Sequence, residues 1–255
     1  MPSTAFESGK YWTKSISPST GCTPYRDRLE PCRICWAREM TKLRPQVDGG
    51  CDFRPTYHES RVNDLMRPKN HVVFANIMGD WCHEAFSHGQ RWTQLLAMGN
   101  AHRSVFLTCT KRTGALEGMA RVEWPMNVWA GATAWDLPSL DRALGALSMH
   151  RTWRWLSLEP LLSDLDDGSD TLAQAMSVAH WAAIGPETGA RGKRRPCSFD
   201  RIRQAIKLCR KAGVVPFVKA VDLGTRISHD PGEWPEDLRV RELPPELERI
   251  LLGKA

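Results

Sequence analysis

The feature that most constrains the fold of this chain is a series of short apolar runs, each followed by a stretch with helical spacing. Six runs recur along the chain: His71–Ile77, Ser104–Cys109, Asn127–Thr133, Trp153–Leu158, His180–Ile184 and Val214–Val218. Short, wholly apolar runs that alternate with helices are typical of a parallel sheet buried on both faces. With Lys10–Ile16 as a first strand, the 255 residues predict an α/β fold, a partial (β/α)6-7 barrel of parallel strands with outer helices. A doubly wound sheet is the alternative that this pattern leaves open.

The segments between the runs carry helix signals. Asp136 is suited to cap a helix that reaches about His150, and Ser198 is suited to cap one that stops at Gly213. Further helices are expected over Trp36–Leu43, His83–Met98, Asp170–Ala179 and Pro245–Leu252.

Two parts of the chain differ in composition. Residues 1–222 are expected to form the barrel, and residues 223–255 form a C-terminal extension rich in proline and charge. No stretch approaches the roughly 18 apolar residues of a membrane helix. The N-terminus shows no basic and apolar signal pattern. We therefore expect a cytoplasmic protein with no membrane partner, in a compartment where cysteines seldom form disulfides.

Three of the eight cysteines cluster in the loop after the first expected strand. Cys22, Cys32 and Cys35 follow the spacing C-x9-C-x2-C. Three soft thiolates suit an iron–sulfur cluster or a zinc ion. Because a four-iron cluster normally takes four cysteines, three would leave one iron open, and an open position is typical of a catalytic metal site. The other cysteines are expected to be mostly small core residues: Cys51, Cys82, Cys109, Cys197 and Cys209.

Polar residues gather where the apolar runs end. In β/α barrels the carboxyl ends of the strands carry the active site, and the cysteine loop follows the first strand at the same edge. These residues also suit solvated loops and helix caps, so either role stays open for each one alone. The candidate site residues at this edge are Asp80, Thr108, Lys111, Thr133, Glu159 and Glu187, with Lys219 after the last run.

The charge of the chain permits a polyanionic partner, since its formal net charge is +6 at pH 7. The densest basic stretch follows the sixth strand and contains Arg191, Lys193, Arg194 and Arg195. Phosphate contact beside the barrel mouth is one interpretation, and a solvated surface is the other. The eleven tryptophans are expected mainly in the core, although an exposed indole can stack on a nucleic-acid base.

The cysteine loop and the strand rhythm together resemble the radical S-adenosylmethionine (radical SAM) superfamily. Its members place three cysteines after the first strand of a partial barrel, usually as C-x3-C-x2-C with an aromatic neighbour. This chain keeps the final C-x2-C and adds Trp36, but has a longer first gap. It is more closely similar to a phage and bacterial family, mostly of unknown function, whose loop opens GCT and continues through C-x2-CYAE. Later blocks in the same order are Met78–Glu84, Leu107–Arg112, Asn127–Gly131, Leu156–Leu162, Gly185–Gly189 and Val215–Lys219.

The resemblance implies a mechanism. Cys22, Cys32 and Cys35 would hold a [4Fe–4S] cluster whose open iron binds S-adenosylmethionine. An electron from an external donor such as flavodoxin or dithionite would release a 5′-deoxyadenosyl radical, which abstracts hydrogen from the substrate. The cofactor-binding residues implied at the strand ends are Asp80 for the ammonium group, Thr108 and Thr133 for ribose or carboxylate, Lys111 for carboxylate or phosphate, and Glu159 and Glu187 for ribose or substrate.

The resemblance also suggests a substrate, because relatives occur in phage pathways that elaborate thymine after replication. The expected partner is DNA carrying a modified base, and the expected reaction is rearrangement of an amino-acid-derived substituent, in the host cytoplasm if the chain is phage-encoded. Such an enzyme would be an isomerase or a lyase. Three alternatives remain open: a DNA-lesion repair lyase of the spore-photoproduct type, an enzyme acting on a small metabolite, or a non-catalytic zinc or iron–sulfur module that binds nucleic acid.

Overall fold

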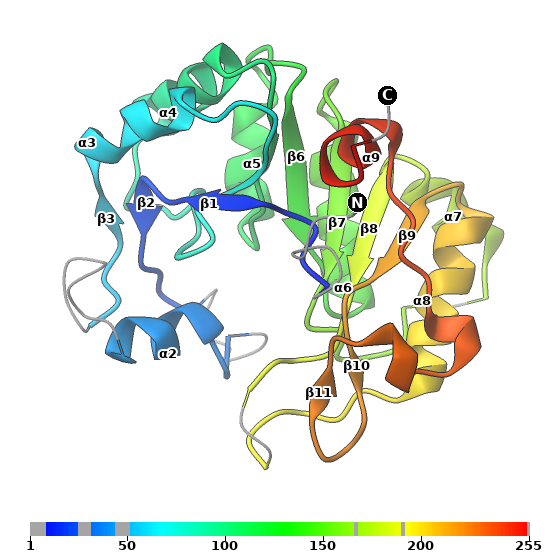
Figure 1. Ribbon diagram of the computed structural model, residues 1–255. Coiled ribbons are helices and arrows are strands. Elements are labelled where there is room, and N and C mark those ends of the chain that lie inside the picture. Colours follow the sequence, from blue (N-terminus) through cyan, green and yellow to red (C-terminus); the bar gives the residue numbers. More distant parts are fainter. Residues whose placement is uncertain (1–8, 25–31, 44–51, 166–167, 190–191, 254–255) are drawn as a thin grey trace.

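In a computed structural model, seven parallel strands form one curled sheet in the order β1-β4-β5-β6-β7-β8-β9. The structure describes residues 9–24, 32–43, 52–165, 168–189 and 192–253. Figure 1 shows the sheet curving as a half-barrel, with the large helices on its outer side. The strands are β1 (Lys14–Ile16), β4 (Val72–Ala75), β5 (Val105–Leu107), β6 (Val128–Thr133), β7 (Arg154–Leu158), β8 (Trp181–Ile184) and β9 (Val215–Val218). The predicted α/β fold and its partial-barrel sheet of parallel strands are therefore confirmed.

The helices begin where the capping signals indicated. Ser198 accepts a hydrogen bond from the backbone N–H of Arg201, and Asp136 accepts one from Ser139, each as an N-cap. The helix expected from His83 starts later, because Ser87 forms the cap and His83 lies in a turn before it. The helices are α2 (Trp36–Leu43), α3 (Glu59–Val62), α4 (His88–Asn100), α5 (Thr113–Met119), α6 (Leu137–Ser148), α7 (Asp170–Met176), α8 (Phe199–Lys211) and α9 (Pro245–Leu251), with 3-10 turns η2 (Asn63–Met66), η3 (Pro231–Glu233) and η4 (Glu236–Leu238). Two-residue strands pair as β2 (Ser19–Thr20) with β3 (Thr56–Tyr57) and as β10 (Val221–Asp222) with β11 (Ile227–Ser228).

Two hydrophobic cores lie on the two faces of the sheet. The larger core is continuous with the outer helices, whereas the smaller one fills the concave face. Successive residues of a strand point to opposite faces of the sheet. Near the strand starts, many of the side chains that point inward are large aromatic rings, so the inner core is mainly aromatic. Its fully buried members are Tyr11, Val72, Leu107, Trp129, Trp155, Trp181, Ala183, Phe217 and Leu247. The predicted core role of the tryptophans is confirmed for most of them, whereas Trp36 is 48% exposed.

The first strand is shorter than predicted because Tyr11 leaves the sheet and packs inside the half-barrel. The Tyr11 ring lies 4.9 Å from the Trp181 ring and 5.5 Å from the Phe217 ring, both edge to face. Burying this ring contributes more than a ladder hydrogen bond at the sheet edge. The N-terminal segment is thus part of the inner core.

The C-terminal extension packs against both cores. Leu243, Leu247 and Leu251 enter the inner core from α9 and the segment before it. Trp234 and Leu238 join the outer core. The Arg241 guanidinium lies 4.9 Å from the Trp234 ring and donates to the carbonyls of Val218 and His229. The extension beyond residue 222 therefore shares its hydrophobic packing with the sheet.

None of the helices in the described ranges combines the length and apolar character needed to cross a bilayer.

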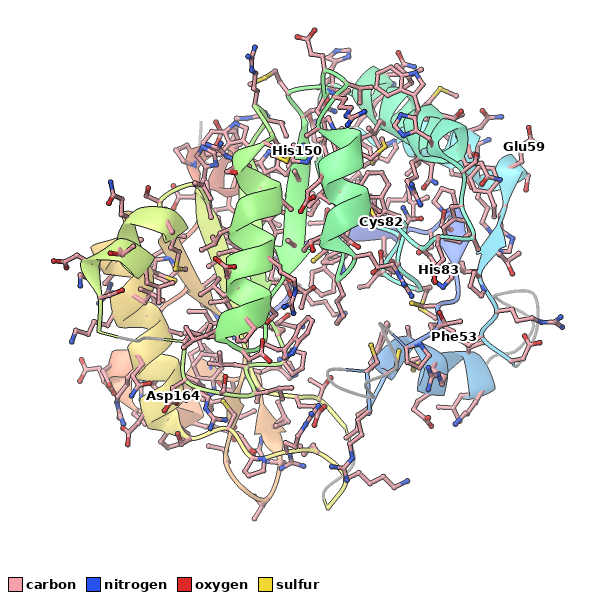
Figure 2. All side chains as sticks on the ribbon, turned by 180° about the vertical axis from the view of Figure 1, so that it is seen from behind. Phe53, Glu59, Cys82, His83, His150 and Asp164 are labelled. Atoms are coloured by element: carbon pink, nitrogen blue, oxygen red, sulfur yellow. The ribbon has the colours of Figure 1, made fainter. Side chains whose placement is uncertain are left out.

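A buried histidine in contact with α5, His150, predicts that the folded protein is less stable in acid. His150, labelled in Figure 2, donates its Nε2–H to the carbonyl of Leu116, and its ring lies 4.8 Å from the Trp124 ring. Burial lowers the pKa of His150, so the folded state prefers the neutral ring. The unfolded chain binds this proton below about pH 6.5, so the free energy of unfolding should fall as the pH drops through that value.

Denaturant titrations at pH 7.5 and pH 5.5 test this point. His150→Gln should lose part of the pH dependence, whereas His102→Gln, at an exposed position, should keep it. Equal dependence in wild type and His150→Gln would show that His150 does not contribute.

Candidate functional site

Most of the site residues predicted at the strand ends line a cavity of about 270 Å³ at the carboxyl ends of the strands. The inward positions of the strands explain its place. The large inner rings of Trp155 and Trp181 give way to the smaller Ser157 and Ala183, and then to polar residues. The cavity is lined by all three loop cysteines and by Asp80, Lys111, Thr133, Glu159 and Glu187, together with Trp36, Phe53, Asn76, Cys109, Thr110, Ser157 and Lys219.

Two glycines bring Cys22 and Asp80 together. Gly21 and Gly79 form a parallel bridge, and the Gly21 N–H donates to the Met78 carbonyl at 2.9 Å. A side chain on Gly79 would lie 2.7 Å from the Gly21 carbonyl oxygen, and Gly21 has a φ of +74°. Both positions therefore require glycine. This close approach sets the residues after each glycine beside the same cavity.

The three loop thiols are free and half-buried. Cys35 directly precedes α2, and its carbonyl accepts the Glu39 N–H at 3.1 Å. The Cys22 N–H donates to the Phe53 carbonyl at 3.1 Å, and Figure 2 places Phe53 and His83 at the end of the molecule where α2 lies. Burial, followed by the charge of Asp80, raises the pKa of Cys22 to about 12.

Asp80 is held by a network of donors. Its Oδ1 accepts the Thr110 hydroxyl at 2.6 Å and the Cys82 N–H at 3.0 Å, while its Oδ2 accepts the Lys111 N–H at 3.1 Å. These contacts fix a carboxylate at the cavity wall, oriented to accept a cationic group. Thr110 was not predicted as a site residue, because nothing in its local sequence shows that its hydroxyl reaches the neighbouring strand end.

Lys111 brings a positive charge to this wall. Among the described residues, its ammonium group makes no hydrogen bond or ion pair. Burial acts to lower the pKa of Lys111, but its electrostatic interactions with the neighbouring thiols and with Asp80 outweigh burial and raise the pKa. The Cys109 thiol lies 3.3 Å from the Thr133 hydroxyl, and burial raises its pKa to about 11. Lys111 is thus a cation placed among thiols, available to an anionic group.

Glu159 occupies another part of the cavity with Lys219. The Lys219 ammonium lies 3.0 Å from Glu159 Oε2, and 5.7 Å from the centre of the Trp12 ring. Tyr11 lies near this carboxylate, and burial, followed by the charge of Glu159, keeps the pKa of Tyr11 well above its usual range. Tyr11 was missed as a site residue, because its role depends on packing against distant strands.

Thr108 requires a correction. Its side chain is fully buried, and its hydroxyl donates to the Trp129 carbonyl at 2.8 Å instead of lining the cavity. Residues alternate faces along a strand, so Cys109, one position later, reaches the inner face. The residue after Thr108 is the one that contacts the cavity.

The basic stretch is largely paired within the protein. Arg195 forms an ion pair with Glu187, donating its Nε–H to Oε2 at 3.0 Å, and Arg194 pairs with Asp222 at 3.1 Å. The Arg194 and Asp222 side chains are only 6% and 5% exposed. A DNA phosphate would have to compete with these carboxylates. Lys193 is exposed, and Arg191 lies outside the described residues.

This segment lies against the cysteine loop. A side chain on Gly189 would meet Ile34 at 2.9 Å. Burial raises the pKa of Glu187, while the Arg195 backbone N–H and then the charge of Arg33 act to lower it. Lys193 contributes, after Lys42, to the lowered pKa of Glu39 in α2. The exposed cations Arg33 and Lys193 therefore flank one side of the cavity.

No three cysteine, histidine, aspartate or glutamate side chains in the described ranges gather around a point that one metal ion would occupy. The three thiols instead share the wall of a larger cavity with Lys111.

The fold and the cavity define a class: an α/β protein whose curled parallel sheet carries a cysteine-lined cavity at the carboxyl ends of its strands. Residues 7–229 match the model of a family described as a protein of unknown function (DUF5131), and the chain belongs to this family. The curated proteins contain no match to the chain. No solved structure matches it either.

Proposed function

We propose that this protein is a radical SAM enzyme. Cys22, Cys32 and Cys35 would hold a [4Fe–4S] cluster, with S-adenosylmethionine bound at the remaining iron. The observation that carries the proposal is that three free thiols share one cavity with the strand-end polar residues of a curled parallel sheet. This is the edge at which β/α barrels carry their chemistry.

The donor set fits such a cluster. Thiolates are the usual ligands of iron–sulfur clusters, and the three available here leave one position for a cofactor. Lys111 lines the same cavity, and a guanidinium nitrogen of Arg112 lies 3.8 Å from the Cys22 sulfur. These two cations would balance the negative charge of the ligating thiolates. When bound, the cluster and cofactor together supply an adenosyl radical for hydrogen abstraction, and the protein orients the reactants and excludes water.

The residues of the cavity then have distinct binding roles. Asp80, held by three hydrogen-bond donors, accepts a hydrogen bond from the ammonium group of the cofactor. Lys111 binds a carboxylate or phosphate, and the hydroxyl of Thr133 binds ribose or carboxylate. Glu159 and Glu187 bind ribose or substrate. Each carboxylate also forms an ion pair, Glu159 with Lys219 and Glu187 with Arg195, so it accepts hydrogen bonds from both its partner and the ligand.

Metal analysis of protein purified without oxygen tests the proposal against a zinc module. We expect iron and acid-labile sulfide, close to four of each per chain, with the broad visible absorption of a cluster. One zinc per chain with no visible chromophore would support a structural zinc site and contradict the proposal.

For the substrate, we propose a modified thymine base in DNA, rearranged or cleaved by an isomerase or lyase reaction. The support is the net charge of +6 and the rim of the cavity, where Arg33, Lys193 and the exposed Trp36 lie. Cations attract the phosphate backbone, and an exposed indole stacks on an unpaired base. A base in duplex DNA would have to flip out to enter the cavity. A repair lyase of the spore-photoproduct type shares this rim chemistry and remains the second candidate.

Neutralising the rim should weaken DNA binding. In the double variant Arg33→Gln/Lys193→Gln, loss of up to two phosphate contacts should lower the slope of log K against log salt by about 1–2. Arg103→Gln/Lys207→Gln removes the same charge at exposed positions on other elements and should bind DNA as the wild type does. Equal slopes for the two variants in a fluorescence-anisotropy titration would contradict this DNA site.

A further inference from the structure

Cys22 needs an anchor of its own. Nine residues separate Cys22 from Cys32. The turn before α2, which carries Cys32 and leads to Cys35, therefore does not fix the position of Cys22. Its backbone is attached through Gly21 to Gly79 and through its N–H to the Phe53 carbonyl. Neither contact sets the direction of the Cys22 side chain, whose thiol donates to the Thr23 carbonyl at 3.1 Å.

Arg112, at the start of α5, makes the contacts that complete this anchor. One terminal nitrogen of its guanidinium lies 3.8 Å from Cys22 Sγ and donates to the Thr23 carbonyl at 3.0 Å and to the Thr23 hydroxyl at 3.2 Å. The other forms an ion pair with Glu84 at 2.6 Å, and the Arg112 side chain is 10% exposed. A planar guanidinium spans such a set of acceptors, whereas a lysine ammonium does not.

Arg112 is also linked to Asp80, through the hydroxyl of Thr110. The Arg112 N–H donates to the Thr110 hydroxyl at 2.9 Å, and that hydroxyl donates to Asp80 Oδ1. His83 supports the other side, because its Nε2 lies 2.8 Å from the Thr23 hydroxyl. Burial lowers the pKa of His83, so the neutral ring serves as a hydrogen-bond partner at pH 7. Arg112 therefore joins the segment that carries Cys22 to the segment that carries Asp80.

We propose that Arg112 is the positioning residue of this site: it fixes Cys22 and holds a positive charge against its sulfur. This inference rests on the proposed function. Hydrogen bonds and charge near ligating sulfurs set the reduction potential of an iron–sulfur cluster. A guanidinium at this distance favours the state that carries more negative charge, so Arg112 makes the cluster easier to reduce by an external one-electron donor.

Three variants of the reconstituted protein test the proposal. Arg112→Gln removes the positive charge, and Arg112→Lys keeps the charge but not the planar guanidinium. As the control, Arg142→Gln removes an arginine from the neighbouring helix α6. The readouts are iron per chain, the midpoint potential from an EPR-monitored titration, and amide hydrogen exchange of residues 21–23. Circular dichroism establishes that each variant is folded.

We expect Arg112→Gln to shift the midpoint potential to more negative values or to lower the iron content, and to speed amide hydrogen exchange at residues 21–23. Arg112→Lys should keep most of the potential while exchange still rises, and Arg142→Gln should match the wild type. Wild-type iron, potential and exchange in folded Arg112→Gln would overturn the proposal. If the wild type holds no cluster at all, the proposed function fails instead, and exchange in the metal-free protein still decides whether Arg112 fixes Cys22.

Discussion

Replacing any one of Cys22, Cys32 and Cys35 by alanine should remove nearly all cluster iron from anaerobically reconstituted protein. Each thiol lines the same cavity, so each is placed to bind one shared cluster. A cluster with only two protein ligands is lost readily, since each thiolate bond contributes to holding it. The triple variant should hold no iron–sulfur cluster and form no product from S-adenosylmethionine.

The matched control is Cys209→Ala. Cys209 is fully buried in α8, within the outer core and away from the cavity lining. Its removal should cost some stability but leave iron and sulfide content unchanged. Colorimetric iron and sulfide assays with the visible spectrum check both cases. Full iron in the Cys22, Cys32 and Cys35 variants, or equal losses in Cys209→Ala, would mean that the loop is not the ligand set.

Deleting residues 223–255 should prevent the chain from folding. The extension contributes six buried apolar side chains: Trp234, Leu238, Val240, Leu243, Leu247 and Leu251. Each contributes about 1.5–3 kcal/mol on burial, so together they rival the roughly 5–15 kcal/mol that keeps a typical domain folded. Expression of residues 1–222 should therefore yield aggregated protein, or soluble protein without a cooperative thermal transition.

Two helical leucines give a milder version of this test. Leu247→Ala in α9 removes a fully buried side chain from the inner core and should cost about 2–5 kcal/mol in a denaturant titration. Leu43→Ala in α2 changes a side chain that is 76% exposed and should stay within about 0.5 kcal/mol of the wild type. A folded, cooperative 1–222 fragment together with a neutral Leu247→Ala would show that the extension is a separate unit.

The sequence predicts the strands and most of the cavity for a common reason. Apolar runs reveal the buried strands, and their ends mark the functional edge, so Asp80, Thr133, Glu159 and Glu187 are found at the cavity. Thr108 shows the limit of this rule. The end of a strand gives the edge but not the face, and the one-residue alternation that turns Thr108 outward brings Cys109 inward.

Other parts of the site depend on contacts that local sequence does not contain. Arg112 reaches Cys22 across 90 positions, and Arg194 reaches Asp222 across 28. A run of basic residues indicates positive charge, but not which carboxylates the fold places beside it. Only the folded chain shows that Arg194 and Arg195 are paired while Lys193 is exposed.

If the cysteine-lined cavity binds the proposed cluster, the protein should cleave S-adenosylmethionine to 5′-deoxyadenosine. The most direct measurement is to incubate anaerobically reconstituted protein with S-adenosylmethionine and dithionite, and to follow 5′-deoxyadenosine by chromatography and mass spectrometry. Wild-type protein should form 5′-deoxyadenosine, and the triple cysteine variant should form none. The account would be contradicted if wild-type protein with a full complement of iron and sulfide formed no 5′-deoxyadenosine, either alone or with DNA that carries modified thymine.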